Sequence, residues 1–124
     1  MLKRFKIRGL QALKKDKVGL IVCLKHIESG KQFVITNSHF EHNPNADYIK
    51  YAQAFWMLKC IQDFYEENEL NQNDVPLIVT GDLNSVPHGS SMHLIMGYKY
   101  DPNYESISND PKFQDAFLEI YKKS

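Results

Sequence analysis

Two short apolar segments on either side of one long helical pattern constrain the fold of this chain more than any other feature. Residues 32–38 and 77–80 have the length and the β-branched content of strands. Residues 46–67 between them carry apolar side chains at helical spacing, including Ala54, Leu58, Ile61 and Tyr65. A strand, a helix and a strand in this order form a right-handed crossover, so the two strands should lie parallel in one sheet. The sequence therefore predicts an α/β fold.

Neighbouring residues predict one more strand and further details of this unit. Residues 18–24 form a nearly continuous apolar run, which predicts a strand buried on both faces and antiparallel to residues 32–38. The segment 77–80 is likewise expected to be a buried strand. Asn45 is the expected N-cap of the long helix, with Asp47 in its first turn.

The C-terminal third predicts a short helix over residues 90–96, a loop over 98–109 and a terminal helix over 112–122. A length of 124 residues with 43% hydrophobic and 24% charged residues is typical of one folded domain. Cys23 and Cys60 fall in a predicted strand and the long helix, where reduced core thiols are expected. No apolar run approaches the roughly 20 residues of a membrane span, so no membrane association is expected.

The net charge of zero conceals a basic start. Residues 1–17 hold seven lysines and arginines but one acidic residue, Asp16. This pattern has three interpretations: a solvated surface, a contact for nucleic-acid phosphates, or a mitochondrial presequence. We accordingly divide the chain into a basic segment, 1–15, and a domain, 16–124.

The predicted parallel strands bring polar residues to one edge of the sheet. Asn37 and His39 end the first strand, and Asp82 and Asn84 end the second. Asp82 and Asn84 are two residues apart, so in extended backbone they point to the same side. A carboxylate and amides at this edge suit a phosphate ester, and α/β sheets often bind ligands there. The competing interpretation is an ordinary Gly-Asp turn that closes a strand.

The order of the motifs resembles one enzyme family. Asn37-Ser-His-Phe40 is similar to its Asn-Thr-His-Leu, and Gly81-Asp-Leu-Asn-Ser-Val-Pro87 to its Gly-Asp-Phe-Asn-Ser-x-Pro. The family is the endonuclease/exonuclease/phosphatase superfamily, in its deadenylase branch of poly(A)-shortening subunits, nocturnin and Angel-like proteins. The remaining matches are Asp16 to Val22, Asn43-Pro44 with Asp47, Lys50 and Gln53, and Phe113 to Phe117.

The resemblance implies a role for each matching residue. His39 would contact the scissile phosphate, Asp82 would orient or deprotonate the attacking water, and Asn84 would bind the phosphate. Asp82 and Asn84 would also help to hold Mg²⁺ or Mn²⁺. Asn37 and Pro44 would contribute to substrate binding, and Pro44 would shape the nucleotide pocket. The implied fold is part of a two-sheet α/β sandwich.

The implied reaction is Mg²⁺-dependent hydrolysis of phosphodiester bonds from the 3′ end of RNA. The implied partners are poly(A) ends and subunits of a deadenylase complex, in the cytoplasm or, alternatively, the nucleus or mitochondria. Two alternatives stay open: a phosphoinositide or sphingolipid phosphoesterase of the same superfamily, and a non-catalytic RNA-binding or interaction module. The first is disfavoured by Ser85-Val86, where phosphoinositide members carry an aromatic-Arg pair.

The chain departs from the family pattern in two respects. Lys17 stands where the family has an asparagine, and we assign it to substrate binding as a point charge. The family's metal-binding glutamate and late Asp-His pair have no counterpart, since no histidine follows His93. We therefore expect only the middle of the domain in this sequence. A sheet built for a sandwich would then expose apolar surface and favour self-association.

Overall fold

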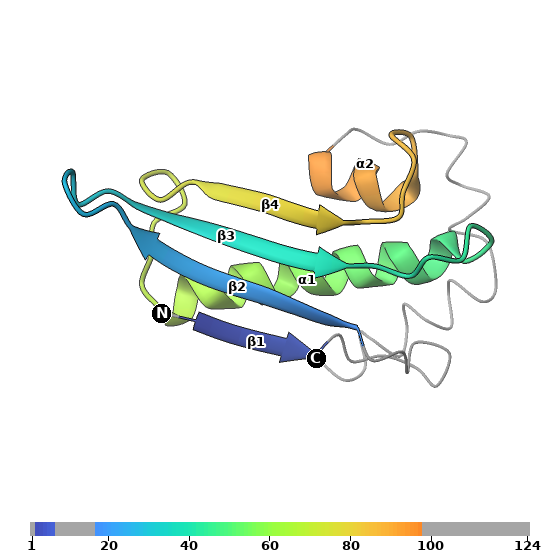
Figure 1. Ribbon diagram of the computed structural model, residues 1–124, viewed down its shortest axis with the longest axis horizontal. Coiled ribbons are helices and arrows are strands. Elements are labelled where there is room, and N and C mark those ends of the chain that lie inside the picture. Colours follow the sequence, from blue (N-terminus) through green and yellow to red (C-terminus); the bar gives the residue numbers. More distant parts are fainter. Residues whose placement is uncertain (1, 7–16, 98–124) are drawn as a thin grey trace.

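The computed structural model describes residues 2–6 and 17–97, which form one sheet and two helices (Figure 1). The predicted loop 98–109, the terminal helix 112–122 and the Phe113 motif lie outside these residues. The elements in chain order are β1 (Leu2–Lys6), β2 (Val18–Lys25), β3 (Gln32–His39), α1 (Asp47–Glu67), β4 (Leu77–Asp82) and α2 (Ser90–Met96).

The sheet has the strand order β1-β2-β3-β4. The first three strands pair antiparallel, and β4 pairs parallel to β3 through the α1 crossover. The predicted strand-helix-strand unit and its parallel register are confirmed. The strand β1 falls within the basic segment 1–15, for which the sequence indicated only a charge pattern.

One face of the sheet packs against α1, which runs behind the strands in Figure 1. Alternate residues of β2 and β3 point to this face, among them Ile21, Val34 and Thr36, which are fully buried. From α1, the predicted residues Ala54, Ile61 and Tyr65 are buried there, whereas Leu58 is only partly covered. The helix also contributes Met57 and Phe64, both fully buried.

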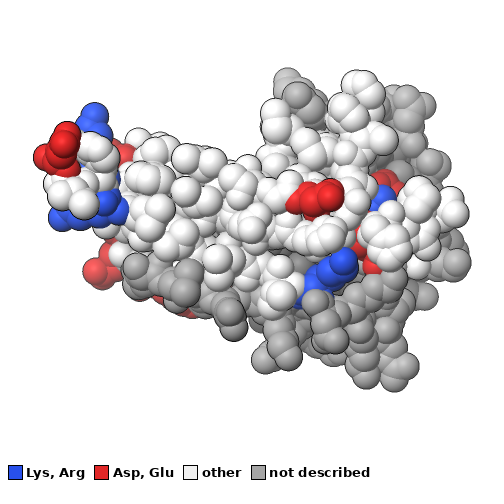
Figure 2. All heavy atoms as spheres, viewed as in Figure 1, with Lys and Arg blue, Asp and Glu red and all other residues white. Residues whose placement is uncertain are grey.

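The opposite face, which we call the open face, is only partly covered. It holds the other alternate residues of three strands: Val18, Leu20, Val22 and Leu24 of β2, Phe33, Ile35, Asn37 and His39 of β3, and Ile78, Thr80 and Asp82 of β4. Figure 2 shows this side as a broad area of uncharged side chains. The prediction that residues 18–24 are buried on both faces is therefore wrong.

A strand was predicted at residues 77–80 and is present, but the prediction that it is buried is wrong. The strand β4 is present, but Leu77 and Ile78 are exposed and Val79 is half-buried. The reason is topological: β4 is at the edge of the described sheet, which leaves Leu77 only partly covered, and Ile78 lies on the open face. An apolar run of this kind cannot by itself distinguish a central strand from an edge strand.

The long helix begins one residue later than predicted, at Asp47, and the predicted N-cap is wrong. Ala46 occupies the cap position and makes no side-chain cap bond. Asn45 does not cap the helix because the preceding loop is closed one turn earlier, where Asn43 Oδ1 accepts the Asn45 N–H at 3.0 Å. Asp47 does lie in the first turn, as predicted. Within the described residues, neither helix has the length and apolarity needed to cross a bilayer.

Candidate functional site

The parallel pairing of β3 and β4 brings the predicted site residues to one end of the open face. In the register of the two strands, His39 lies beside Asp82 and Asn37 beside Thr80. The two strands stay connected beyond the last pair, because the Phe40 N–H donates to the Asp82 carbonyl at 2.9 Å. All four side chains are exposed. An imidazole and a carboxylate therefore stand together at the C-terminal edge of the sheet, open to a ligand.

Asn84 reaches the same edge through a turn and not through extended backbone. The strand ends at Asp82, and Asn84 adopts a left-handed conformation with φ of 46°. Its backbone N–H donates to Asp82 Oδ1 at 2.9 Å, which closes a small Asx turn. The assumption of extended backbone is therefore wrong, although the two side chains remain neighbours.

The side chain of Asn84 is fixed by the end of β3. Its Nδ2 donates to the Phe40 carbonyl at 3.0 Å. This bond turns the amide so that Oδ1, the group that binds metals or accepts hydrogen bonds, points away from the Phe40 carbonyl. The same residue, Phe40, thus links β3 to Asp82 through its N–H and to Asn84 through its C=O. The relative positions of all three site residues follow from this pair of bonds.

Gly81 allows the two strands to approach each other at the site. It has a φ of 133°, and a Cβ atom there would overlap the backbone of Ser38. Only glycine fits such a position without moving one of the strands. The glycine immediately before Asp82 therefore has a structural reason, which is to let Asp82 stand directly beside His39.

Thr80 is a site residue that the sequence reasoning missed. Its Oγ1 donates to the Thr36 carbonyl at 2.6 Å and lies 3.4 Å from Asn37 Oδ1. The hydroxyl proton is thus directed to the Thr36 carbonyl, and Thr80 lies next to the end of the Asn37 side chain on the open face. The signal was available in principle, since parallel pairing and a two-residue period set Thr80 opposite Asn37.

The loop after β3 is anchored by two further polar residues that are buried. The N–H of Glu41 donates to Gln53 Oε1 of α1 at 2.8 Å, and Glu41 Oε1 accepts the Asn43 N–H at 3.0 Å. Glu41 Oε1 also lies 3.1 Å from His42 Nδ1. These contacts attach the segment that carries His39 to the long helix. Gln53 was noted only as part of a motif, and Glu41 was not singled out.

The two remaining predicted site residues, Lys17 and Pro44, make no hydrogen bond to His39, Asp82 or Asn84 among those found in the described residues. Lys17 immediately precedes β2, whose first residues pair with the last residues of β3. It is partly buried. Pro44 is exposed in the loop before α1, five residues after His39. The structure therefore brings Asn37, His39, Asp82 and Asn84 to one edge, with Lys17 at the start of the neighbouring strand.

Within the described residues, no three histidine, cysteine, aspartate or glutamate side chains form a cluster that could hold a metal alone. The oxygen donors available at the site are the Asp82 carboxylate and Asn84 Oδ1. Mg²⁺ commonly binds one or two carboxylates, several waters and a substrate phosphate, so this pair fits part of such a site. The chemistry available here is that of anion and metal-ion binding at a strand edge.

Comparison with known proteins places this geometry in context. The chain is 33% identical over 98 residues to Protein angel homolog 2 of Danio rerio, a match of 76% of this chain and 17% of that protein. It is 27% identical over 93 residues to the CCR4-Not complex 3'-5'-exoribonuclease subunit Ccr4 of Yarrowia lipolytica, covering 60% of this chain and 13% of that subunit. No family model matches the chain.

Two solved structures share the fold. The human nocturnin catalytic domain, solved with a bound sulfate anion, superimposes with a TM-score of 0.63 and 26% identity over 75% of this chain. An endonuclease/exonuclease/phosphatase family protein from Bacteroides thetaiotaomicron gives a TM-score of 0.64 at 18% identity, which supports the fold alone. The match covers 33% of the nocturnin chain and 34% of the bacterial one.

The fold is therefore that of the endonuclease/exonuclease/phosphatase proteins, and the predicted α/β class is confirmed. The homologues of the chain are Ccr4, Angel and nocturnin proteins, so the resemblance indicated by the motifs is confirmed as well. The chain spans about an eighth to a sixth of the length of the curated relatives named above.

Proposed function

We propose that this chain supplies the phosphate-binding edge of a metal-dependent 3′-to-5′ exoribonuclease that acts on poly(A) ends. The observation that carries the proposal is the side-by-side register of His39 and Asp82, with Asn84 held beside them by Phe40. Homology to a protein named as an exoribonuclease subunit supports the class of reaction. As in that complex, RNA and subunits of a deadenylase assembly are the partners we propose.

In this proposal each side chain has a distinct task. Asp82, whose Oδ1 is held by the Asn84 N–H, orients the attacking water and accepts its proton. His39 donates a hydrogen bond to the scissile phosphate and stabilises the charge that develops there. The Asn84 amide and the Asn37 amide bind phosphate or ribose oxygens. Lys17 contributes a positive charge, and Pro44 borders the space for the terminal nucleotide.

Asp82 and Asn84 are also the residues that would hold Mg²⁺ or Mn²⁺. Bound there, the ion would act as a Lewis acid on the phosphate and offset its negative charge. The orientation of Asn84 supports this assignment, since its Nδ2 is occupied by the Phe40 carbonyl and its Oδ1 is directed elsewhere. The remaining ligands would be waters and phosphate oxygens.

The test uses the full 124-residue chain and an RNA labelled at its 5′ end that terminates in an adenosine tract. We expect shortening from the 3′ end that requires Mg²⁺ or Mn²⁺. Asp82→Ala should reduce the rate by about 10² to 10⁴-fold, because a general base and a metal ligand are lost together. Gel analysis of single-nucleotide steps gives the direction and the rate.

Asp74→Ala is the matched control, since Asp74 is an exposed aspartate in the loop before β4. It should leave the rate unchanged. An absence of shortening under all metal conditions would refute the exonuclease proposal for this chain. Salt-sensitive RNA binding without turnover would then favour the RNA-binding alternative. Cleavage of soluble inositol phosphates in place of RNA would favour the phosphoesterase alternative.

A further inference from the structure

A single peptide unit connects the candidate site to the interior of α1. The C=O of Phe40 and the N–H of Glu41 belong to this unit, which follows directly after β3. The Phe40 carbonyl accepts a hydrogen bond from Asn84 Nδ2 at 3.0 Å, and the Glu41 N–H donates to Gln53 Oε1 at 2.8 Å. A trans peptide unit is planar, with its C=O and N–H on opposite sides. Asn84, this peptide unit and Gln53 therefore form one continuous line of hydrogen bonds, which we call the amide relay.

The two ends of the amide relay differ in their exposure to water. Asn84 is partly exposed at the site, whereas Gln53 is buried in α1. The peptide unit between them is enclosed as well, since Phe40 and Glu41 are both fully buried. In an enclosed place a hydrogen bond is stronger than in water, and neighbouring bonds in a line polarise one another. The outer bond at Asn84 should therefore depend on the inner bond at Gln53.

Loss of the Gln53 acceptor would turn the peptide unit. A buried N–H without an acceptor is costly, so the Glu41 N–H would rotate towards another partner. Because the unit is rigid, the Phe40 carbonyl would rotate with it and leave its position opposite Asn84 Nδ2. The Phe40 N–H belongs to the preceding peptide unit, so its bond to the Asp82 carbonyl does not prevent this rotation. On the N–H side of the unit, the bond to Gln53 is the one that resists it.

We propose that Gln53 is a positioning residue, which orients the Asn84 amide at the site through the Phe40–Glu41 peptide unit. With Nδ2 held by the Phe40 carbonyl, Asn84 Oδ1 faces away from that carbonyl, towards a ligand. Side chains that orient a metal-binding group affect metal affinity although they touch no metal. The assignment of Asn84 to a phosphate or a metal rests on the proposed function, whereas the amide relay itself does not.

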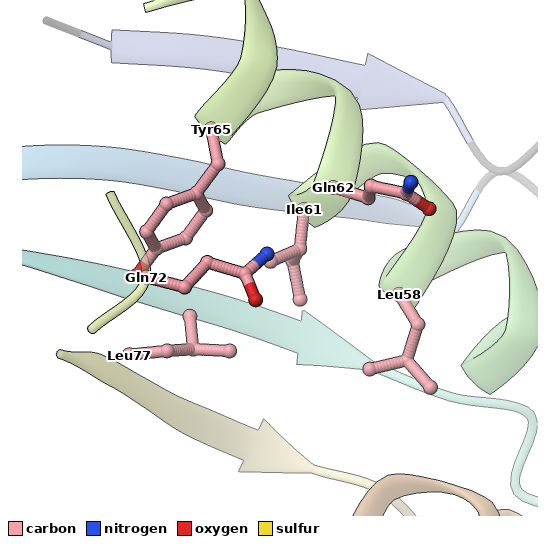
Figure 3. Close-up of a pocket in the computed structure, with 6 residues that line it drawn as sticks. All are labelled: Leu58, Ile61, Gln62, Tyr65, Gln72 and Leu77. Carbon is pink, nitrogen blue, oxygen red and sulfur yellow. The ribbon is translucent and has the colours of Figure 1, made fainter. Parts of the chain in front are cut away.

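The competing interpretation is that Gln53 only stabilises the fold. A bond of that kind exists near the C-terminal end of α1, where the Tyr65 hydroxyl donates to the Val75 carbonyl at 2.8 Å. Tyr65 lies beside a hollow of about 280 Å³ between α1 and β4, away from the site (Figure 3). Tyr65→Phe therefore removes one buried bond from α1 to a backbone group without touching the amide relay. A purely stabilising Gln53 should behave as Tyr65 does.

The test compares NMR spectra of the full 124-residue chain, labelled with a nitrogen isotope and free of metal. Gln53→Met keeps the length of the side chain but removes the oxygen acceptor. We expect the Glu41 N–H signal to move upfield and the side-chain amide signals of Asn84 to shift with it. Gln62→Met is the matched control, because it makes the same exchange at an exposed residue of α1 that lines the hollow in Figure 3. Neither Gln62→Met nor Tyr65→Phe should move the Asn84 signals.

Two variants keep the inference testable if Gln53→Met does not fold. Gln53→Glu retains an oxygen acceptor at the same position, so it should keep the Asn84 signals close to those of the wild type. Asn84→Asp removes the donor at the other end of the amide relay, and aspartate tolerates the left-handed conformation of this residue. It should move the Glu41 N–H signal upfield. An unmoved Glu41 signal in Asn84→Asp, or unmoved Asn84 signals in Gln53→Met, would overturn the inference.

A Mn²⁺ titration measures the consequence for the site without RNA. Bound Mn²⁺ broadens the NMR signals of nearby residues, so its affinity follows from the signals of Asp82 and Asn84. Gln53→Met should weaken this affinity about 10-fold to 100-fold, whereas Tyr65→Phe should leave it unchanged. Equal affinities of Gln53→Met and the wild type would overturn the positioning role. A wild type that binds no Mn²⁺ would count against the metal site of the proposed function, and the metal-free spectra would still decide whether Gln53 orients Asn84.

Discussion

The face of the sheet that packs on α1 and the open face differ in burial although they alternate along the same strands. Ile21, Val34 and Thr36 on the helix-covered face are fully buried. Val18 and Leu24 on the open face are 54% and 41% exposed. Because hydrophobic stabilisation follows the apolar area removed from water, most of it should come from the helix-covered face.

The difference also separates the residues that stabilise the fold from the candidate site residues. His39 and Asp82 lie at the end of the open face, where they are exposed and contribute little to the core. Two other residues hold them in place. Gly81 packs against the Ser38 backbone, and the buried Gln53 of α1 binds the Glu41 N–H of the loop after β3. Substitutions of the site residues should thus change binding, whereas substitutions behind them should change folding.

The largest expected effect tests the comparison of the two faces directly. Phe64→Ala removes a fully buried ring of α1 from the helix-covered face. It should lower the free energy of unfolding by about 3 to 5 kcal/mol, because transfer and cavity costs add. Leu24→Ala on the open face is the control and should cost less than about 1 kcal/mol. Urea denaturation followed by circular dichroism measures both.

Equal losses for the two variants would show that the open face is as well packed as the helix-covered face. A larger loss for Leu24→Ala than for Phe64→Ala would reverse the comparison altogether.

Most of the fold followed from local patterns in the sequence. The crossover from β3 through α1 to β4 was predictable because a strand-helix-strand order has one favoured handedness. Burial was predicted less well, since residues 18–24 and 77–80 have the composition of central strands. What they pack against depends on the position of each strand in the sheet, and a single strand's sequence does not encode that position.

The meeting of the candidate residues at one edge was predictable, but the local geometry there was less so. Asn37, His39, Asp82 and Asn84 meet at one edge because their strands are parallel. The left-handed turn at Asn84 and the bonds of Phe40 could not be read from the residues, since they depend on the distance between two strand ends. For the same reason Thr80 was missed, although its spacing from Asp82 placed it on the same face.

The next prediction concerns Gly81, where β4 comes close to the backbone of β3. Gly81→Ala should cost about 2 to 3 kcal/mol, because the new Cβ would overlap the Ser38 backbone at an unfavourable φ. Gly97→Ala is the matched control, since Gly97 also has a positive φ of 65° but no atom within 4 Å of the added Cβ. It should cost about 1 kcal/mol from backbone strain alone. Thermal unfolding of both variants separates overlap from strain, and equal shifts would contradict the close approach at Gly81.

The smallest effect tests the far end of the helix-covered face, where Tyr65 of α1 is tied to the segment before β4. Its hydroxyl donates to the Val75 carbonyl at 2.8 Å, so Tyr65→Phe should cost about 1 kcal/mol of the free energy of unfolding at neutral pH.

The same residue should make stability depend on pH in the alkaline range. Burial raises the pKa of Tyr65 above its usual value of 10.0. Above pH 10 the unfolded chain therefore loses this proton first, and the wild type should lose stability as the pH rises towards the folded pKa. The Tyr65→Phe variant should lose less, which urea denaturation at pH 8 and pH 11 would show. Burial raises the pKa of Tyr51 too, so Tyr51→Phe is the comparison for the alkaline part. An unchanged pH dependence in Tyr65→Phe would mean that Tyr65 ionises as freely in the folded protein as in the unfolded chain, and that this end of the face is open to water.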